Sequence, residues 1–219
     1  MIEDARNNTL RLGRSDARVS LVVGVLLLTG AAWAAGIDLA SEVERNSVPL
    51  DWLGTIYKLL AATVLVRLGM ELHSRSMWSL AILLALMTVG SLAIGSRWFN
   101  AAAEIVTRPI SDVVGRSPVF LKLAGMFIAL ALVGGTLVWK AYREATPFER
   151  PAVMRLIAVI AVVGFFVGPV NALSTQGITR MLLFAEDFGQ VVSLAVLTGY
   201  GAGLLAAVVG RSDVSVERA

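Results

Sequence analysis

Long runs of apolar residues, separated by short polar segments, dominate the pattern along the chain. Runs of about 20 residues are long enough to cross the hydrocarbon core of a bilayer as helices. The pattern therefore predicts an all-α integral membrane protein, a bundle of six transmembrane helices. The predicted spans are residues 19–37, 52–72, 77–96, 118–139, 153–173 and 188–209, within a transmembrane domain of residues 19–209. Residues 1–18 and 210–219 are a polar N-terminal segment and a polar tail.

The segment 97–117, between the third and fourth spans, has a different pattern. Trp98, Ala102 and Ile105 fall on one face of a helix. The proline at position 109 is expected to break that helix, because it disfavours helical backbone at the preceding residue. We predict two short amphipathic pieces lying in the membrane interface. An ordinary loop with some apolar packing is the alternative.

The first span has a competing interpretation. Ala32 and Ala34 form an A-x-A site after a short apolar run, which is typical of a cleavable signal peptide. We interpret the segment as a retained first helix that resembles a signal anchor. The sequence does not determine whether it is cleaved in the cell.

Composition supports the membrane class and narrows the chemistry. The chain is 57% hydrophobic and 16% charged, whereas soluble domains carry roughly 25% charged residues. It has no cysteine and one histidine, His73, which argues against disulfides, thiolate metal sites and multi-histidine centres. We therefore expect no metal and no cofactor. The net charge of +3 gives no indication of nucleic-acid binding.

Basic residues in short loops predict the orientation, because they are enriched on the cytoplasmic side. They are more numerous in the N-terminal segment, around residues 67–75 and 140–155, and in the tail than on the other side. We predict that both termini are cytoplasmic. The excess of arginine over lysine, with abundant alanine, valine and glycine, indicates a GC-rich bacterial genome and hence the inner membrane.

The second span carries charges within an apolar run. Thr63, Arg67 and Glu71 are spaced i, i+4, i+8 and form one polar stripe, while Lys58 is nearly opposite. The stripe is a candidate ion path or interhelical salt bridge. The alternative is snorkelling, in which Arg67 and Lys58 each reach the nearest headgroup layer.

The fifth span combines small residues with a proline. Gly164 and Gly168 form a GxxxG motif, which permits close helix packing. A proline and four polar residues follow: Pro169, Asn171, Ser174, Thr175 and Gln176. Such a stretch is a candidate broken-helix site, in which freed backbone groups face a substrate. The alternative is a helix that ends at the proline, followed by a polar loop.

The sixth span begins after two acidic residues and contains a second small-residue motif. Glu186 and Asp187 are a candidate acidic mouth on the outer side, or simply complement the dipole at the helix N-terminus. Gly199 and Gly203 are candidate helix-packing residues.

These features leave several functions open. No phosphate-binding glycine loop, nucleophile elbow or H-E-x-x-H motif is present, so an enzyme is less favoured. We expect a small subunit or scaffold of a membrane complex, which docks a partner through its helix faces and segment 97–117. Its partners would be the bilayer and another membrane subunit or a second copy. The alternative is a transporter or channel that uses Arg67, Glu71 and the broken fifth helix at 169–176. The sequence specifies neither substrate nor biological process.

Overall fold

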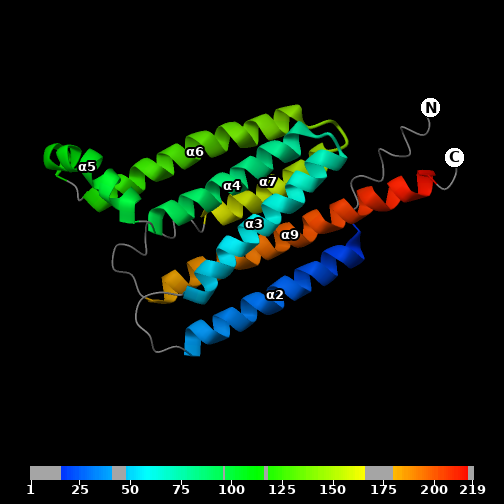
Figure 1. The fold of residues 1–219 in the computed structure, drawn as a ribbon, viewed down its shortest axis with the longest axis horizontal. Coiled ribbons are helices and arrows are strands. Elements are labelled where there is room, and N and C mark those ends of the chain that lie inside the picture. Colours follow the sequence, from blue (N-terminus) through cyan, green and yellow to red (C-terminus); the bar gives the residue numbers. More distant parts are fainter. Residues whose placement is uncertain (1–15, 41–47, 96, 116–117, 166–179, 217–219) are drawn as a thin grey trace.

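The structure, a computed structural model, describes residues 16–40, 48–95, 97–115, 118–165 and 180–216. Within these ranges the chain forms seven α-helices and no strand (Figure 1). The helices are α2 (Ala17–Ala40), α3 (Val48–Glu71), α4 (Arg75–Gly95), α5 (Arg97–Val114), α6 (Pro118–Glu144), α7 (Arg150–Phe165) and α9 (Arg180–Val216). The prediction of an all-helical protein is confirmed.

Four of these helices are long and apolar enough to cross a membrane, judged by length and composition. The qualifying segments are Ala17–Ile37, Pro49–Glu71, Arg75–Leu92 and Phe184–Val209. Several helices of this kind are typical of a membrane protein. The predicted count of six spans exceeds these four.

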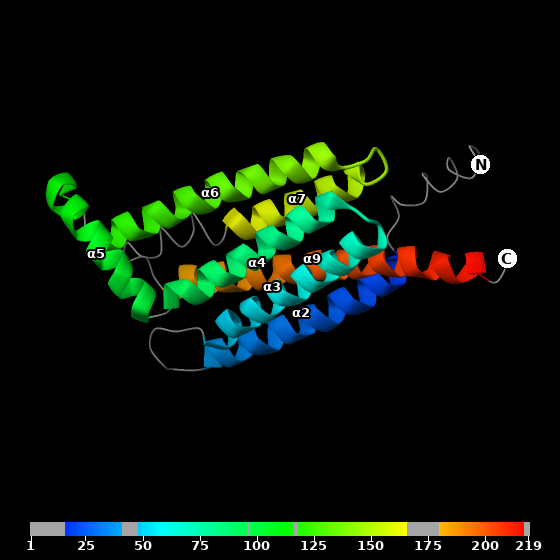
Figure 2. The ribbon, with the colours of Figure 1, turned by 45° about the horizontal axis from the view of Figure 1, so that its top comes forward.

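The helices α2, α3, α4, α6, α7 and α9 run side by side, and α5 lies at one end of them (Figures 1 and 2). Helix α9 contacts α2, α3 and α7, while α4 contacts α3 and α6. We name the two ends of the bundle the α5 end and the turn end, because the turn between α3 and α4 lies opposite α5. The start of α2 and the end of α9 both lie at the turn end (Figure 1).

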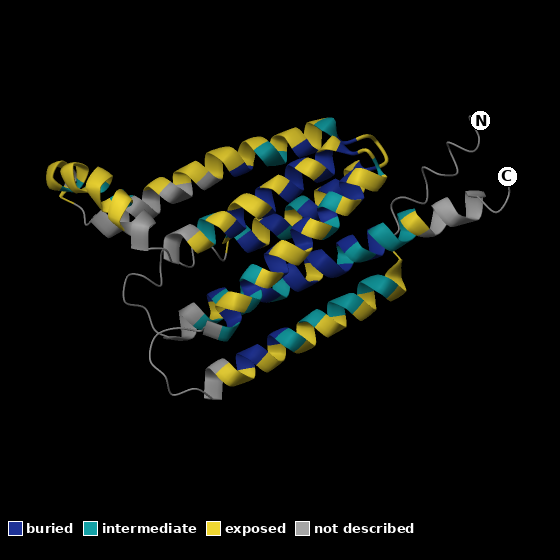
Figure 3. Cartoon of the chain, viewed as in Figure 1, coloured by how far each residue is buried: buried dark blue, intermediate teal, exposed yellow. Residues whose placement is uncertain are grey.

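Buried residues line the inner faces of the helices, whereas many large apolar side chains are exposed on the outer faces (Figure 3). On α3 the buried stripe follows spacings of three and four residues and comprises Gly54, Lys58, Ala61, Leu65 and Leu68. Such spacings place residues on one helix face. On the outside, Leu26 and Leu132 are 67% and 68% exposed. An apolar exterior of this kind suits contact with lipid.

Small residues allow α9 to approach its neighbour α2 closely. A Cβ added at Gly199 would lie 3.0 Å from the backbone oxygen of Ser20, and one added at Gly203 would overlap the Ser20 hydroxyl. The Asp16 amide donates a hydrogen bond to the Gly203 carbonyl at 2.9 Å. Glycine is needed at both positions, because a side chain would force the two helices apart.

The glycine of the predicted fifth span has different surroundings. A Cβ added at Gly164 would meet nothing within 4 Å, so no described neighbour packs closely there. Gly168 lies outside the described residues.

The turn between α3 and α4 is closed by backbone hydrogen bonds. The His73 amide donates to the Met70 carbonyl at 3.3 Å, and the Ser74 amide donates to the Gly69 carbonyl at 3.0 Å. These two bonds define a Schellman motif, which usually has glycine in the left-handed position. Here His73 occupies it with a φ of 50°. His73 is therefore the C-terminal capping residue of α3.

Helix α5 differs from its predicted form. It is one continuous helix from Arg97 to Val114 with Pro109 inside it, so the predicted break at the proline is wrong. A proline within a helix removes the one hydrogen bond that its own N–H would donate. The carbonyl that loses this bond belongs to Ile105, which is 76% exposed and lies on an accessible face.

Candidate functional site

Lys58 lies inside the bundle, with only 3% of its surface exposed. This burial argues against the alternative in which Lys58 reaches the headgroup layer. Lys58 belongs to the buried stripe of α3, and its neighbours Gly54 and Ala61 on that stripe are buried as well. Because this stripe packs against other helices, the lysine points into the protein rather than toward lipid.

The ammonium group of Lys58 has a defined partner on α4. Its Nζ donates a hydrogen bond to Ser91 Oγ at 2.8 Å. Ser91 Oγ donates its own proton to the Met87 carbonyl at 3.0 Å. The hydroxyl therefore presents its lone pairs to the ammonium group. Through this chain of bonds, α4 orients the lysine.

Three carboxylates attract this charge electrostatically. Asp51 on α3 and Glu186 and Asp187 on α9 all interact electrostatically with the Lys58 ammonium group. Glu186 is itself buried, with 6% of its surface exposed. Taking a charge out of water is costly unless opposite charges and hydrogen bonds compensate. The carboxylates of α9 thus offset part of the cost of burying this charge.

Gln190 completes the polar group, one helical turn after Glu186. Its side chain is buried, and its Oε1 lies 3.3 Å from the position that a Cβ on Gly54 would occupy. The absence of a side chain at Gly54 leaves room for this amide between α3 and α9. We refer to these residues together as the Lys58 cluster: Asp51, Lys58, Ser91, Glu186, Asp187 and Gln190.

The Lys58 cluster contains groups that exchange protons and groups of opposite charge. An amine, three carboxylates, a hydroxyl and an amide can hold or pass protons or stabilise a cation. Within the described residues, no group of three or more histidine, cysteine, aspartate or glutamate side chains is placed to hold a metal ion.

Glu186 and Asp187, the predicted acidic mouth, are members of this cluster and do not lie at a helix N-terminus. Helix α9 begins at Arg180, so Glu186 and Asp187 lie within the helix rather than at its N-terminus. Complementing the helix dipole therefore does not account for them, since that effect is confined to the first turn. Both carboxylates instead act on Lys58.

The predicted polar stripe lies on the opposite, outer side of α3. Thr63, Arg67 and Glu71 are all exposed there. Thr63 Oγ1 donates a hydrogen bond to the Leu59 carbonyl of its own helix at 2.8 Å. Among the described residues, no ion pair joins Arg67 to Glu71. The stripe is thus part of the outer surface of the bundle and separate from the Lys58 cluster.

A shallow groove of about 260 Å³ runs between α3 and α4 beside this stripe. Small residues form much of its lining: Ala62, Thr63, Ala81 and Ala85. Leu59 and Trp78 contribute larger walls. Thr63 therefore belongs both to the polar stripe and to the groove.

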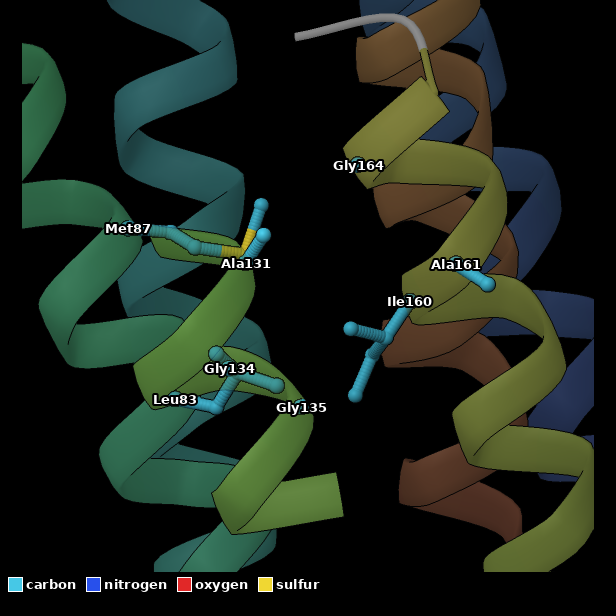
Figure 4. A pocket seen from close by; sticks show the side chains of 8 residues that line it. All are labelled: Leu83, Met87, Ala131, Gly134, Gly135, Ile160, Ala161 and Gly164. Atoms are coloured by element: carbon cyan, nitrogen blue, oxygen red, sulfur yellow. The ribbon is translucent and has the colours of Figure 1, made fainter. Parts of the chain in front are cut away.

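A second cleft, of about 280 Å³, lies between α4 and α6 on one side and α7 on the other (Figure 4). Its lining includes Gly134 and Gly135 of α6 and Ile160 and Gly164 of α7. These residues carry no polar side chain, so the cleft presents an apolar surface.

The predicted broken-helix site cannot be compared with this geometry. Pro169, Asn171, Ser174, Thr175 and Gln176 lie outside the described residues. The described part of α7 ends at Phe165.

Three residues of the Lys58 cluster, Lys58, Ser91 and Gln190, were not among the site residues predicted from the sequence. One signal was present for the lysine, because Gly54, Lys58 and Ala61 share a helix face that contains small residues. Nothing in the sequence indicated which serine or glutamine would lie beside it.

No family model matches this chain. Likewise, neither a curated protein nor a solved structure matches it.

Proposed function

We propose that the chain is a six-span protein of the bacterial inner membrane, with α6 and α7 as the two further spans. Both helices run alongside the four candidate spans in the bundle (Figures 1 and 2). Exposed tryptophans lie toward both ends, as expected for interfacial belts. Trp33 and Trp52 lie toward the α5 end, whereas Trp78 and Trp139 lie toward the turn end.

The spacing of these tryptophans fits a bilayer. The ring of Trp78 lies 3.0 Å from the position of a Cβ on Gly69, so the two residues are at the same level. From Trp52 to Gly69, α3 rises about 17 residues, or roughly 26 Å. A hydrocarbon core is about 30 Å thick. On this placement Lys58 lies roughly 9 Å deeper than Trp52, within the hydrocarbon layer.

The orientation in this proposal has both termini in the cytoplasm. Exposed basic residues cluster at the turn end: Arg18, Arg67, Arg75, Lys140, Arg143 and Arg150. Basic residues favour the cytoplasmic side. The turn end, where α2 starts and α9 ends, would therefore be cytoplasmic.

Helix α5 would lie in the outer interface. Ile105, Val106 and Val113 are 76%, 66% and 87% exposed. Glu104 and Arg108 form an ion pair at 4.0 Å, one turn apart. A helix with exposed apolar and charged residues, lying at one end of the bundle, is suited to the boundary between headgroups and acyl chains.

We further propose that the protein acts as a subunit or scaffold that binds a partner helix in the membrane. The observation that carries this proposal is the outer face of α3 and α4, where the small-residue groove adjoins exposed Thr63 and Arg67. Helix interfaces in membranes are enriched in small residues and use polar side chains as additional contacts. A charged residue facing lipid is costly, and a partner would lower that cost.

Site-specific photo-crosslinking in native membranes tests this function. A photoreactive amino acid at Thr63 should give a discrete protein adduct, because this position lines the proposed interface. The same probe at Leu132, which is 68% exposed on α6, is the matched control and should react with lipid only. The absence of a protein adduct at Thr63 would rule the function out.

The Lys58 cluster favours a second candidate function, the movement of protons or cations. An ionisable group within the hydrocarbon layer of a membrane protein commonly marks an ion or proton path. In proteoliposomes that contain a pH-sensitive dye, the wild type should dissipate an imposed proton gradient and Lys58→Met should not. Lys140→Met is the matched control, since Lys140 is exposed on α6. Equal, basal dye signals for all three proteins would exclude proton movement.

A further inference from the structure

We propose that the partner of the α3–α4 groove is a second copy of this chain, related by a two-fold axis along the membrane normal. This inference rests on the proposed function, because it names the occupant of the same outer face. It follows from the arrangement of charge, the lining of the groove and the symmetry that a membrane imposes.

The symmetry constrains how two copies meet. Both copies insert in the same orientation, so a closed dimer has its axis perpendicular to the membrane plane, and the same patch serves on both sides. The α3 helices of the two copies then run parallel. Residues at one depth face residues at the same depth, or one turn away, on the other helix.

The charges of α3 are self-complementary under this symmetry. Arg67 and Glu71 are both exposed and stand one turn apart, about 6 Å along the helix axis. No ion pair joins them within the described chain. Across the axis, each Arg67 can reach Glu71 of the second copy, which gives two equivalent ion pairs. Near the end of the span such pairs reduce the cost of holding charge beside hydrocarbon.

The shape of the groove matches the same partner. Its small residues Ala62, Ala81 and Ala85 permit a close approach. Leu59 lies in the groove and is 51% exposed, so it is available to pack against its counterpart in the second copy. The outer faces of α3 and α4 carry exposed residues that no other described helix covers (Figure 3).

Cysteine crosslinking provides a direct test, because the chain contains no cysteine of its own. Thr63→Cys, treated in native membranes with a short bismaleimide, should give a species of twice the chain mass. Leu132→Cys on the exposed face of α6 is the control and should remain monomeric. Two tagged versions of the chain, co-expressed, should appear together in the crosslinked species.

The outcomes distinguish this inference from the proposed function. Thr63→Cys without a dimer, together with a photo-adduct of a different protein at Thr63, overturns the second copy and leaves the scaffold function standing. No protein adduct by either method overturns both. A crosslinked dimer that contains both tags supports both.

A charge exchange tests the reciprocal ion pairs. Arg67→Glu or Glu71→Arg alone should reduce the Thr63→Cys dimer roughly tenfold, because like charges then face each other, and tenfold corresponds to about 1.4 kcal/mol. The double variant Arg67→Glu/Glu71→Arg should restore the dimer. Arg143→Glu, at an exposed site on α6, should have no effect. A double variant no better than the singles would overturn the pairing.

Discussion

At the scale of single residues, Lys58 is the most informative position. It is a buried cation that donates a hydrogen bond to Ser91 on α4 and is attracted electrostatically by carboxylates that include Glu186 on α9. Lys58 therefore links three helices. Helix α3 supplies the positive charge, α4 supplies the hydroxyl that accepts its hydrogen bond, and α9 supplies carboxylates that attract it. Removing one member of such a group costs more than its contacts alone, because a buried charge is left behind.

We expect Lys58→Met to lower the melting temperature in detergent, by the equivalent of roughly 1–3 kcal/mol, because the hydrogen bond to Ser91 and the attraction to the carboxylates are lost. The double variant Lys58→Met/Glu186→Gln should recover part of the loss, because one of the negative charges that the lysine had offset is then removed as well. Thermal unfolding followed by circular dichroism measures both, and Lys140→Met controls for loss of an exposed lysine. A Lys58→Met protein as stable as wild type would contradict the buried group.

His73 permits a prediction in the opposite direction. Its φ of 50° is a left-handed conformation, which costs a residue with a Cβ roughly 1–2 kcal/mol. His73→Gly should therefore raise stability by up to about 1 kcal/mol, since greater freedom of glycine in the unfolded chain offsets part of the relief. His73→Ala keeps the Cβ and should give no gain. Equal melting temperatures for the two variants would argue against strain at this turn.

At the scale of elements, the contact between α2 and α9 depends on the absence of side chains. The backbone of α2 at Ser20 and Gly24 lies 3.0–3.1 Å from the position of a Cβ on Gly199. A side chain at position 199 of α9 therefore cannot fit unless the backbone of α2 or α9 moves. Gly164, by contrast, faces open space in the described structure. Gly164 and Gly199, which the sequence predicted alike to be packing residues, thus have different surroundings.

Gly199→Val should destabilise the bundle by about 1–3 kcal/mol, the usual range for overpacking. Gly164→Val is the matched control, because nothing lies within 4 Å of its Cβ, and it should leave stability nearly unchanged. Melting temperatures in the same detergent compare the two variants. Similar losses for both would mean that helix propensity, rather than contact with α2, sets the cost.

At the scale of the whole molecule, the bundle has two chemically different ends. The turn end carries exposed basic residues such as Arg75 and Arg143, and the α5 end carries α5 and the carboxylates of Asp51 and Asp187. A membrane aligns such a molecule, because basic residues favour the cytoplasmic side. The Lys58 cluster would then be nearer to the outer surface than to the cytoplasm.

Labelling of single cysteines in whole cells tests this orientation. With a membrane-impermeant maleimide, Ala101→Cys on exposed α5 should react from outside. Arg75→Cys, at the start of α4, should react only after the membrane is permeabilised. The reverse pattern would place both termini outside and contradict the basic-residue argument.

The helical class and the approximate extent of the helices were predictable, because a long apolar run is a local property of the chain. The predicted span 77–96 lies close to α4, and 52–72 lies close to α3. Ends were less predictable, since contacts and hydrogen bonds extend or close a helix. Pro109 shows this within α5, where one missing hydrogen bond did not end the helix.

The sequence by itself determined that this is an all-helical protein with membrane-spanning character and that α3 carries charges on two opposite faces. Only the tertiary structure decided which face is inside. In a membrane helix both the lipid-facing and the protein-facing sides are apolar, so periodicity gives no rotation about the helix axis. Because α3 packs against α4 and α9, the Lys58 side chain is buried in the bundle, whereas the Arg67 side chain is exposed on its outer surface. The candidate site therefore depended on contacts between helices that no single segment encodes.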